Sequence, residues 1–250
     1  MDGFKAVFIN EIEKLYRKKK AAVIVIISLF AIVLGQLIVL GVRRGFGLGV
    51  VSSTEFPLLV LSLFNNTILP LFAALVTIDI FSGEFSHNTM KIAFTRPVTR
   101  LKIFAAKLTA IAFFVLANLL TVMILSTLAG VIFNPSSASV EAFFRIIVSY
   151  LVTLVPIMVL VLFIVLLTNI FRSGTTVFFF TLLVFIACKV LGVTFSQYSN
   201  LFITSMLDWY VIWIGDSIPV FKALRQFLIL LGYGIMFFTA GYYLFDKKDL

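Results

Sequence analysis

A polar stretch separates two long apolar runs of the chain and reads Gly83-Glu84-Phe85-Ser86-His87-Asn88-Thr89-Met90-Lys91, then Arg96-Pro97-Val98-Thr99-Arg100. Around it the chain is strongly apolar: 62% of its 250 residues are hydrophobic, 29 are phenylalanine, and the mean hydropathy is +1.16. A soluble domain of this length cannot bury so much apolar surface, so most of the chain is expected to lie in lipid. The polar stretch is then the place where a partner in water would bind.

Six apolar runs reach the length of about 20 residues that a helix needs to cross the hydrocarbon of a bilayer. They cover residues 21–42, 57–81, 108–133, 146–171, 175–195 and 227–245. Each run is continuously apolar rather than alternating, which favours helices over a membrane barrel. The sequence therefore predicts an all-α membrane protein with six transmembrane helices, forming a single domain over residues 1–250.

The distribution of Lys and Arg residues predicts how the chain is oriented in the membrane. Six spans put both termini on one side, and 14 of the 20 Lys and Arg residues fall on that side against six on the other. Because positive charge collects on the cytoplasmic side, both termini are expected in the cytoplasm. The charges gather at the ends of the apolar runs rather than along a stripe, which argues against nucleic-acid binding. The single cysteine, Cys188, excludes an internal disulfide.

The first 20 residues have the pattern of an amphipathic helix. The positions that share one face are Phe4, Val7, Phe8, Glu11, Ile12 and Leu15. Only Glu11 on this face is not apolar, and a basic cluster at 17–20 follows. We expect a helix lying in the inner membrane interface. The alternative is a solvated cytoplasmic tail that only marks topology.

The second span holds Asn65 and Asn66 near its middle and Asp79 near its inner end. Polar groups are costly in hydrocarbon, so these side chains should face other helices or a water-filled path. One interpretation makes all three part of a substrate route. The other makes the asparagines a means of helix packing and lets Asp79 reach interfacial water.

Motifs of catalysis are absent from the sequence. His87 is the only histidine, so a metal site is not expected, and neither HExxH nor GxSxG occurs. The chain also lacks the phosphate-binding loop GxxxxGK[ST]. We expect that this chain is not an enzyme, and that any ATP hydrolysis would belong to another polypeptide.

Taken together, the basic amphipathic start, the six spans and the stretch from Gly83 to Lys107 resemble the type-2 permeases of ATP-binding-cassette (ABC) transporters. The matching positions are Glu84, Asn88-Thr89-Met90-Lys91, Arg96-Pro97-Val98-Thr99-Arg100 and Lys107. The ending Phe245-Asp246-Lys247-Lys248-Asp249-Leu250 is also similar to a tail common in that family.

The resemblance implies a membrane subunit that pairs with a second permease chain, identical or homologous, and binds two cytoplasmic ABC ATPase subunits. ATP and magnesium would bind on those partners, and this chain would bind no cofactor. Residues 83–107 would form a cytoplasmic coupling helix between spans two and three. The ATPase-docking positions would be Glu84, Asn88, Thr89, Lys91, Arg96 and Arg100, with Arg172 in a second, smaller contact. An ordinary charged loop that marks topology is the alternative.

The connection 196–224 before the last span is long and rich in Trp and Tyr. It would form short helices in the outer interface, where these residues prefer to lie, or dip back into the membrane against protein or water.

We therefore expect the permease subunit of an ABC exporter in the bacterial plasma membrane, surrounded by lipid. Its cargo would be amphipathic or hydrophobic, such as a peptide antibiotic or a lipid-like molecule. A sensory or mechanical ABC subunit without cargo would share these features. An ion-coupled secondary transporter would need ionisable residues at the middle of the membrane, where this sequence is expected to have asparagines and to keep its acids near the interfaces.

Overall fold

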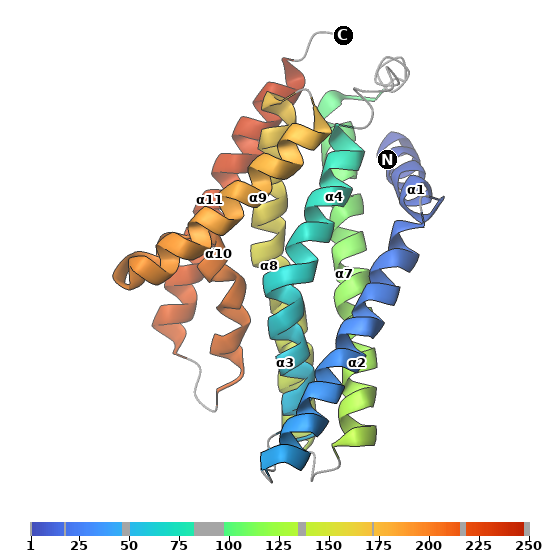
Figure 1. The fold of residues 1–250 in the computed structure, drawn as a ribbon. Coiled ribbons are helices and arrows are strands. Elements are labelled where there is room, and N and C mark those ends of the chain that lie inside the picture. The colour runs from blue at the N-terminus through green and yellow to red at the C-terminus, as the bar shows by residue number, and fades with distance from the viewer. Residues whose placement is uncertain are drawn as a thin grey trace.

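The computed structural model describes residues 2–17, 19–46, 51–82, 98–134, 139–171, 173–215 and 219–247. All regular structure in these ranges is helical, and six of the helices are long and apolar enough to cross a membrane. The predicted fold class and number of spans are therefore confirmed. The start of α1 and the end of α11 lie at the same end of the bundle, here called the terminal end, and the opposite end is the far end (Figure 1).

The first half of the chain forms α1 (Asp2–Arg17), α2 (Lys20–Phe46), α3 (Glu55–Leu63), the π-helix η1 (Phe64–Ile68), α4 (Leu69–Phe81) and α7 (Arg100–Phe133). The second half forms α8 (Val140–Ile170), α9 (Gly174–Thr194), the 3-10 helix η2 (Ser196–Leu201), α10 (Ile203–Met206), the 3-10 helix η3 (Leu207–Trp213) and α11 (Val220–Asp246). Helices α3, η1 and α4 follow one another without a break and make the second span.

Helix α7 is longer than the predicted third span. It has 34 residues and is therefore about 51 Å long, against about 30 Å of hydrocarbon. The prediction began this span at residue 108, because Arg100, Lys102 and Lys107 were assigned to the cytoplasmic coupling segment 83–107. These long side chains are good helix formers, and the helix includes them as it extends beyond the apolar layer.

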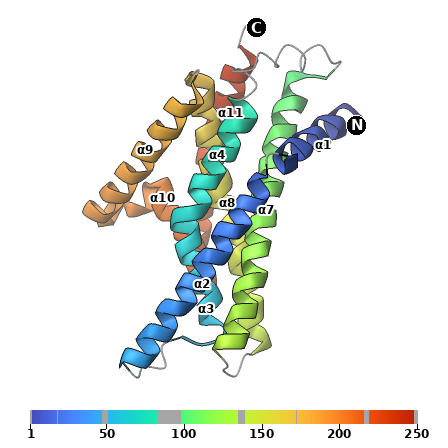
Figure 2. The ribbon, with the colours of Figure 1, turned by 45° about the vertical axis from the view of Figure 1, so that its right-hand side comes forward.

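Helix α1 lies beside the terminal part of α7 rather than in line with α2 (Figures 1 and 2). The chain turns between the two helices at Lys19, whose φ is 53°. The apolar face predicted for α1 is the face that packs: Val7 and Leu15 are buried, and the ring of Phe8 meets Phe113 of α7 edge-on at 6.4 Å. A helix is thus found over the predicted N-terminal range, and its place in the membrane interface stays a prediction.

The core centres on α8, which packs against α4, α7, α11 and η3. In its most apolar stretch 56% of the residues are buried, compared with 11% for α9 and 17% for α11. Tyr150 of α8 is fully buried, and its hydroxyl donates to the carbonyl oxygen of Pro57 at 2.9 Å and lies 3.0 Å from Ser126 Oγ. This satisfied polar contact joins α3, α7 and α8 inside the bundle.

An aromatic cluster joins α4, α7 and α11 at the terminal end. The ring of Phe104 lies 5.6 Å from Phe81 and 5.3 Å from Phe245, measured between centroids. Phe81 and Phe245 also meet directly at 6.1 Å. Tilted and edge-on aromatic contacts of this kind favour a fixed arrangement of the three helix ends.

Gly130 provides a test of the packing at the far end. A Cβ added there would lie 2.5 Å from the backbone oxygen of Ser53, so α7 approaches the 51–54 turn more closely than any side chain allows. Gly130→Ala is expected to lower the thermal midpoint in nanodiscs by about 5 °C.

The control is Gly232→Ala, where an added Cβ meets nothing within 4 Å. This helical position should tolerate or gain from alanine, which favours helix over glycine by about 1 kcal/mol. A Gly130→Ala protein that unfolds no earlier than the Gly232→Ala protein would show that the close approach is absent.

Candidate functional site

The predicted ATPase-docking positions lie mostly outside the described residues. This holds for Glu84, Asn88, Thr89, Lys91, Arg96 and Arg172, whose roles stay predictions. Arg100 is described and begins α7, where its guanidinium Nη1 donates to the carbonyl oxygen of Asp246, the last residue of α11. The start of α7 is thereby joined to the end of the last span.

A buried ion pair joins α1 to α7. Lys107 Nζ lies 3.4 Å from Glu11 Oε1, and the two side chains are only 1% and 3% exposed. The same ammonium donates to the carbonyl oxygen of Ile80 at 3.0 Å and lies 5.9 Å from the centroid of the Phe81 ring. We call Glu11, Ile80, Phe81 and Lys107 the terminal junction. It brings together α1, the end of α4 and the start of α7.

The terminal junction lies where the chain enters and leaves the predicted coupling segment. Phe81 is the last residue of α4, and α7 begins at Arg100, so the junction joins the two helices that enclose residues 83–97. A displacement of that stretch would act on α4 and α7, and Glu11 extends the connection to α1. Packed helices respond to such a force as bodies rather than by bending smoothly.

The sequence contained one signal for this pair. Glu11 is the only acidic residue on the apolar face of α1, and a charge in such a position requires a partner when the face packs. Lys107 was counted with the charges that mark topology, and its burial was missed. Lys14 also reaches Glu11 Oε1, at 2.9 Å, from the outer side of α1.

A second polar cluster lies halfway along the second span. Asn65 is fully buried and donates through Nδ2 to the carbonyl oxygen of Leu207 at 2.6 Å. Asn66 donates to Asp208 Oδ1 at 2.8 Å, and Lys189 Nζ donates to Asn66 Oδ1. Both asparagines belong to the π-helix η1, a wider turn of the kind that often marks functional sites.

The position of this cluster along the second span follows from the rise of the helix per residue. Asn66 lies eleven residues after Glu55, hence about 16 Å from the far end of the span. Lys189 is one of the six basic residues counted on the side opposite the termini, slightly inside the membrane edge, and its ammonium donates to Asn66 halfway along the second span. The amide of Asn66 thus lies between Lys189 and the carboxylate of Asp208. Asp79 lies thirteen residues beyond Asn66, about 20 Å away, and does not join the cluster.

The aromatic connection lies beside the spans. Its η3 helix begins at Leu207, whose carbonyl oxygen accepts from Asn65. The residue after η3, Ile214, accepts a hydrogen bond through its carbonyl oxygen from Arg145 Nη1 at 3.0 Å, near the start of α8. Trp209 and Tyr210 are buried, mainly through the packing of η3 on α8. The segment therefore packs alongside the spans, and its place relative to the membrane, in the outer interface or within it, stays a prediction.

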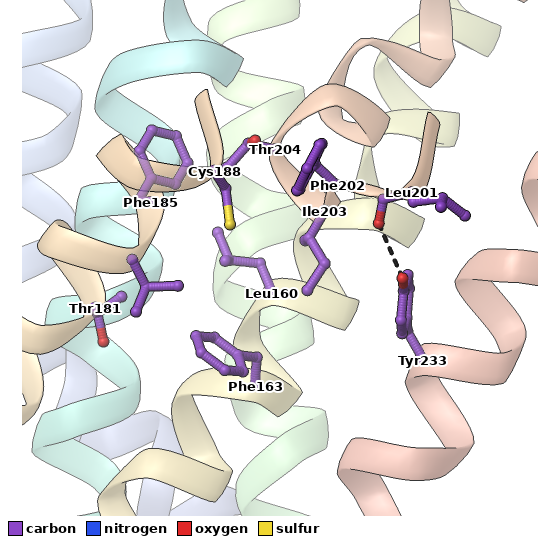
Figure 3. Close-up of a pocket in the computed structure, with 11 residues that line it drawn as sticks. Leu160, Phe163, Thr181, Phe185, Cys188, Leu201, Phe202, Ile203, Thr204 and Tyr233 are labelled. Atoms are coloured by element: carbon purple, nitrogen blue, oxygen red, sulfur yellow. Dashed lines mark hydrogen bonds between the residues drawn. The ribbon is translucent and has the colours of Figure 1, made fainter. Parts of the chain in front are cut away.

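Two cavities flank α9. One, of about 230 Å³, lies between α8, α9, η2, α10 and α11 (Figure 3). The other, of about 210 Å³, lies between α4, α8 and α9 and reaches Asn66. They share the wall formed by Leu160, Thr181 and Phe185. Among the described residues, no three His, Cys, Asp or Glu side chains gather as a metal site would require.

Removing one charge of the terminal junction tests the ion pair. Lys107→Met removes the buried cation and leaves only the partly exposed Lys14 beside the buried Glu11 carboxylate, and the loss of a buried partner costs about 3–5 kcal/mol in comparable pairs. The thermal midpoint in nanodiscs is expected to fall by about 10 °C. Glu11→Leu combined with Lys107→Met removes both charges and should restore most of that loss.

The matched control is Lys14→Met, because Lys14 contacts the same carboxylate from a partly exposed position. Exposed ion pairs contribute about 1 kcal/mol or less to stability, so the thermal midpoint of this variant should stay close to that of the unaltered protein. If the thermal midpoint of the double variant fell by the sum of the losses of the Glu11→Leu and Lys107→Met variants, the pairing of Glu11 with Lys107 would be contradicted.

Comparison with known proteins agrees with the resemblance found in the sequence. The family described as "ABC-2 family transporter protein" matches residues 7–189, which include most of α1 and the first four spans. The chain is 25% identical over 215 residues to "Uncharacterized protein YhcI" of Bacillus subtilis (strain 168), a match that covers 74% of this chain and 66% of that relative. The chain is therefore a multi-pass membrane protein that belongs to the ABC-2 family of transporter proteins.

Proposed function

We propose that this chain is the permease subunit of an ABC exporter, which dimerises, binds two separate ATPase subunits and moves an amphipathic or hydrophobic compound across the membrane. Family membership supports the class of transporter. The terminal junction is the observation that supports coupling, since it ties α1, α4 and α7 together at the ends of the stretch 83–97.

The mechanism starts at that stretch. Closure of ATP-bound partners would displace residues 83–97, and α4 and α7 would follow because the stretch joins them directly. Glu11 would carry α1 along through Lys107, and the bond from Arg100 to the end of α11 would bring the last span. A movement at the terminal end would thus reach four helices, of which three cross the membrane.

Charge supports a cytoplasmic terminal end in the bacterial plasma membrane. The excess of Lys and Arg lies on the side of the termini, and the positive-inside rule assigns that side to the cytoplasm. The ATPases would bind there. ATP and magnesium would then be bound by the partners, and this chain would contribute motion rather than catalysis.

A second permease chain, identical or homologous, would complete the assembly. The most apolar stretches of α2 and α9 are only 28% and 11% buried, so both helices present wide apolar faces. In the assembly lipid or the second chain would cover these faces, and helices in lipid associate through close packing rather than through hydrophobic force.

One observation favours an ion-coupled transporter as the second candidate. Lys189 and Asp208 lie at mid-depth on either side of Asn66, where the sequence was expected to have no charges. Ionisable groups at this depth often belong to ion pathways. The two candidates differ in their energy source: vanadate, which blocks ABC ATPases, would stop an exporter, and a proton uncoupler would stop an ion-coupled transporter.

Purification from the native host tests the proposal. Tagged protein is extracted in mild detergent or nanodiscs, and mass spectrometry identifies what accompanies it. An ABC ATPase should co-purify, and Glu84→Ala combined with Lys91→Ala should remove it, because charged pairs at a docking surface set register and association.

The control removes one acid and one base at the far end, Glu141→Ala with Lys222→Ala, both of which are exposed. This variant should retain the ATPase. Failure to recover any ATPase with the unaltered protein under several mild conditions would remove the basis for the exporter.

A further inference from the structure

Helix α9 packs on the bundle mainly through its first half. Of its residues, all of which the structure describes, only Val177 and Thr181 are buried. A Cβ added at Gly174 would lie 2.9 Å from Ile78 Cγ2 of α4, so the first turn of α9 packs tightly on the second span. From there α9 slants away from α8 toward the far end (Figures 1 and 2). Its far half therefore needs other contacts to stay beside the bundle.

On one side the far half of α9 contacts η2 and α10. A Cβ added at Gly192 would lie 2.9 Å from Ser205 Oγ of α10. The η2 helix is in turn bonded to α11, because the Tyr233 hydroxyl donates to the carbonyl oxygen of Leu201 at 2.9 Å (Figure 3). These contacts join the end of α9 to the last span.

On the other side a chain of three polar groups joins α9 to the second span. Lys189 Nζ of α9 donates to Asn66 Oδ1 of η1, and Asn66 Nδ2 donates to Asp208 Oδ1 of η3 at 2.8 Å. The η3 helix packs on α8. Hydrogen bonds to charged groups are about twice as strong as neutral ones. A few of them can therefore hold a helix that is otherwise poorly packed.

The cavity of about 210 Å³ extends from this polar chain toward the start of α9. Its lining on the second span runs from Asn66 to Ala74, and Phe178 and Phe185 of α9 line it on the opposite side. Ala74 is only 2% exposed and belongs to a core cluster with Val177 of α9. The width of this cavity therefore depends on how closely α9 lies against the second span.

We propose that Lys189, Asn66 and Asp208 form a latch that holds the far half of α9 against the second span and keeps this cavity narrow. When the latch is broken, the far half of α9 stays attached to η2 and α10 and moves away from the second span. The packed start of α9 at Gly174 is the pivot, so the cavity widens toward the lipid between α4 and α9. A displacement of the second span relative to η3 breaks the latch, because Asn66 is then drawn away from both of its charged partners.

A pair of distances measures this movement. In a Cys188→Ser background, spin labels on the exposed positions Leu63 of α3 and Val190 of α9 report the far half of α9. Labels on the exposed positions Leu75 of α4 and Phe179 of α9 report the region near the pivot. The full chain is studied in nanodiscs without ATPase, and labelled chain is diluted with unlabelled chain so that only distances within one chain are read.

Lys189→Met removes the donor and the charge of the latch and is expected to add a population with a longer distance between residues 63 and 190. A rotation of about 15° around Gly174 moves Val190 by about 6 Å, because the 16 residues between them span about 24 Å of helix. Phe179 lies only about 8 Å from the pivot and moves by about 2 Å. The unaltered protein should show a single short distance at both pairs.

Exchanging the two charges tests the latch without relying on one variant. Lys189→Asp or Asp208→Lys alone places like charges on either side of Asn66 and should lengthen the 63–190 distance. The two changes together restore opposite charges, which the Asn66 amide can bridge after turning around, and the short distance should return. Lys222→Met removes an exposed base of α11 outside the latch and should leave both distances unchanged.

A 63–190 distance that stays short in Lys189→Met would overturn the latch. Equal lengthening at the two pairs would show that the whole helix leaves the bundle and would contradict the pivot. Failure of the exchanged charges to restore the short distance would show that the charges do not act as a pair. None of these results depends on an ATPase, so a failed co-purification would count against the exporter function alone.

Discussion

The buried contact between Glu11 and Lys107 is the interaction on which the rest of the terminal end depends. Two opposite charges lie 3.4 Å apart with almost no exposure to solvent, and the ammonium also reaches the backbone of α4 at Ile80. Such a pair does not add much stability compared with apolar side chains, but removing one partner is costly. Its effect is therefore to fix where α1 sits. Helix α1, which would otherwise slide on the bundle, is held to the two helices that enclose residues 83–97.

The polar cluster halfway along the second span is also made of buried polar groups that need partners. In a membrane every buried polar group needs a partner, and the π-helix η1 directs two consecutive asparagines to the returning segment η3. Asn65 binds the backbone at Leu207, and Asn66 lies between Asp208 and Lys189. These contacts hold η3 and α9 against the second span. The Asn66 amide bridges the Lys189 ammonium and the Asp208 carboxylate. None of the residues that line the two cavities beside α9 carries a charge. In the proposed exporter, the terminal end would provide the connection to the ATPase, and the cavities beside α9 would provide space for an apolar molecule.

Much of the fold could be predicted because a lipid environment leaves few choices. Long apolar runs must be helices, and all six spans were found. The start of α7 was missed because its basic residues were assigned to the cytoplasmic coupling segment. The two asparagines were correctly expected to need partners, but those partners lie 142 positions away, and no local pattern identifies them. Glu11 and Lys107 are 96 positions apart, so only the isolated acid on an apolar face indicated a contact. The contact of Lys189 with Asn66 could not be predicted because it depends on how α9 slants, which is a tertiary property.

The claim that α1, α4 and α7 move as one body can be tested by a distance measurement. In a Cys188→Ser background, spin labels are placed on the exposed positions Ala6 of α1 and Leu101 of α7, and the complex with its ATPase is compared with and without ATP. The account predicts the same narrow distance distribution in both states, and a broad one when Lys107→Met removes the pair. A distance between α1 and α7 that shifts on ATP binding while Glu11 and Lys107 are intact would contradict the account.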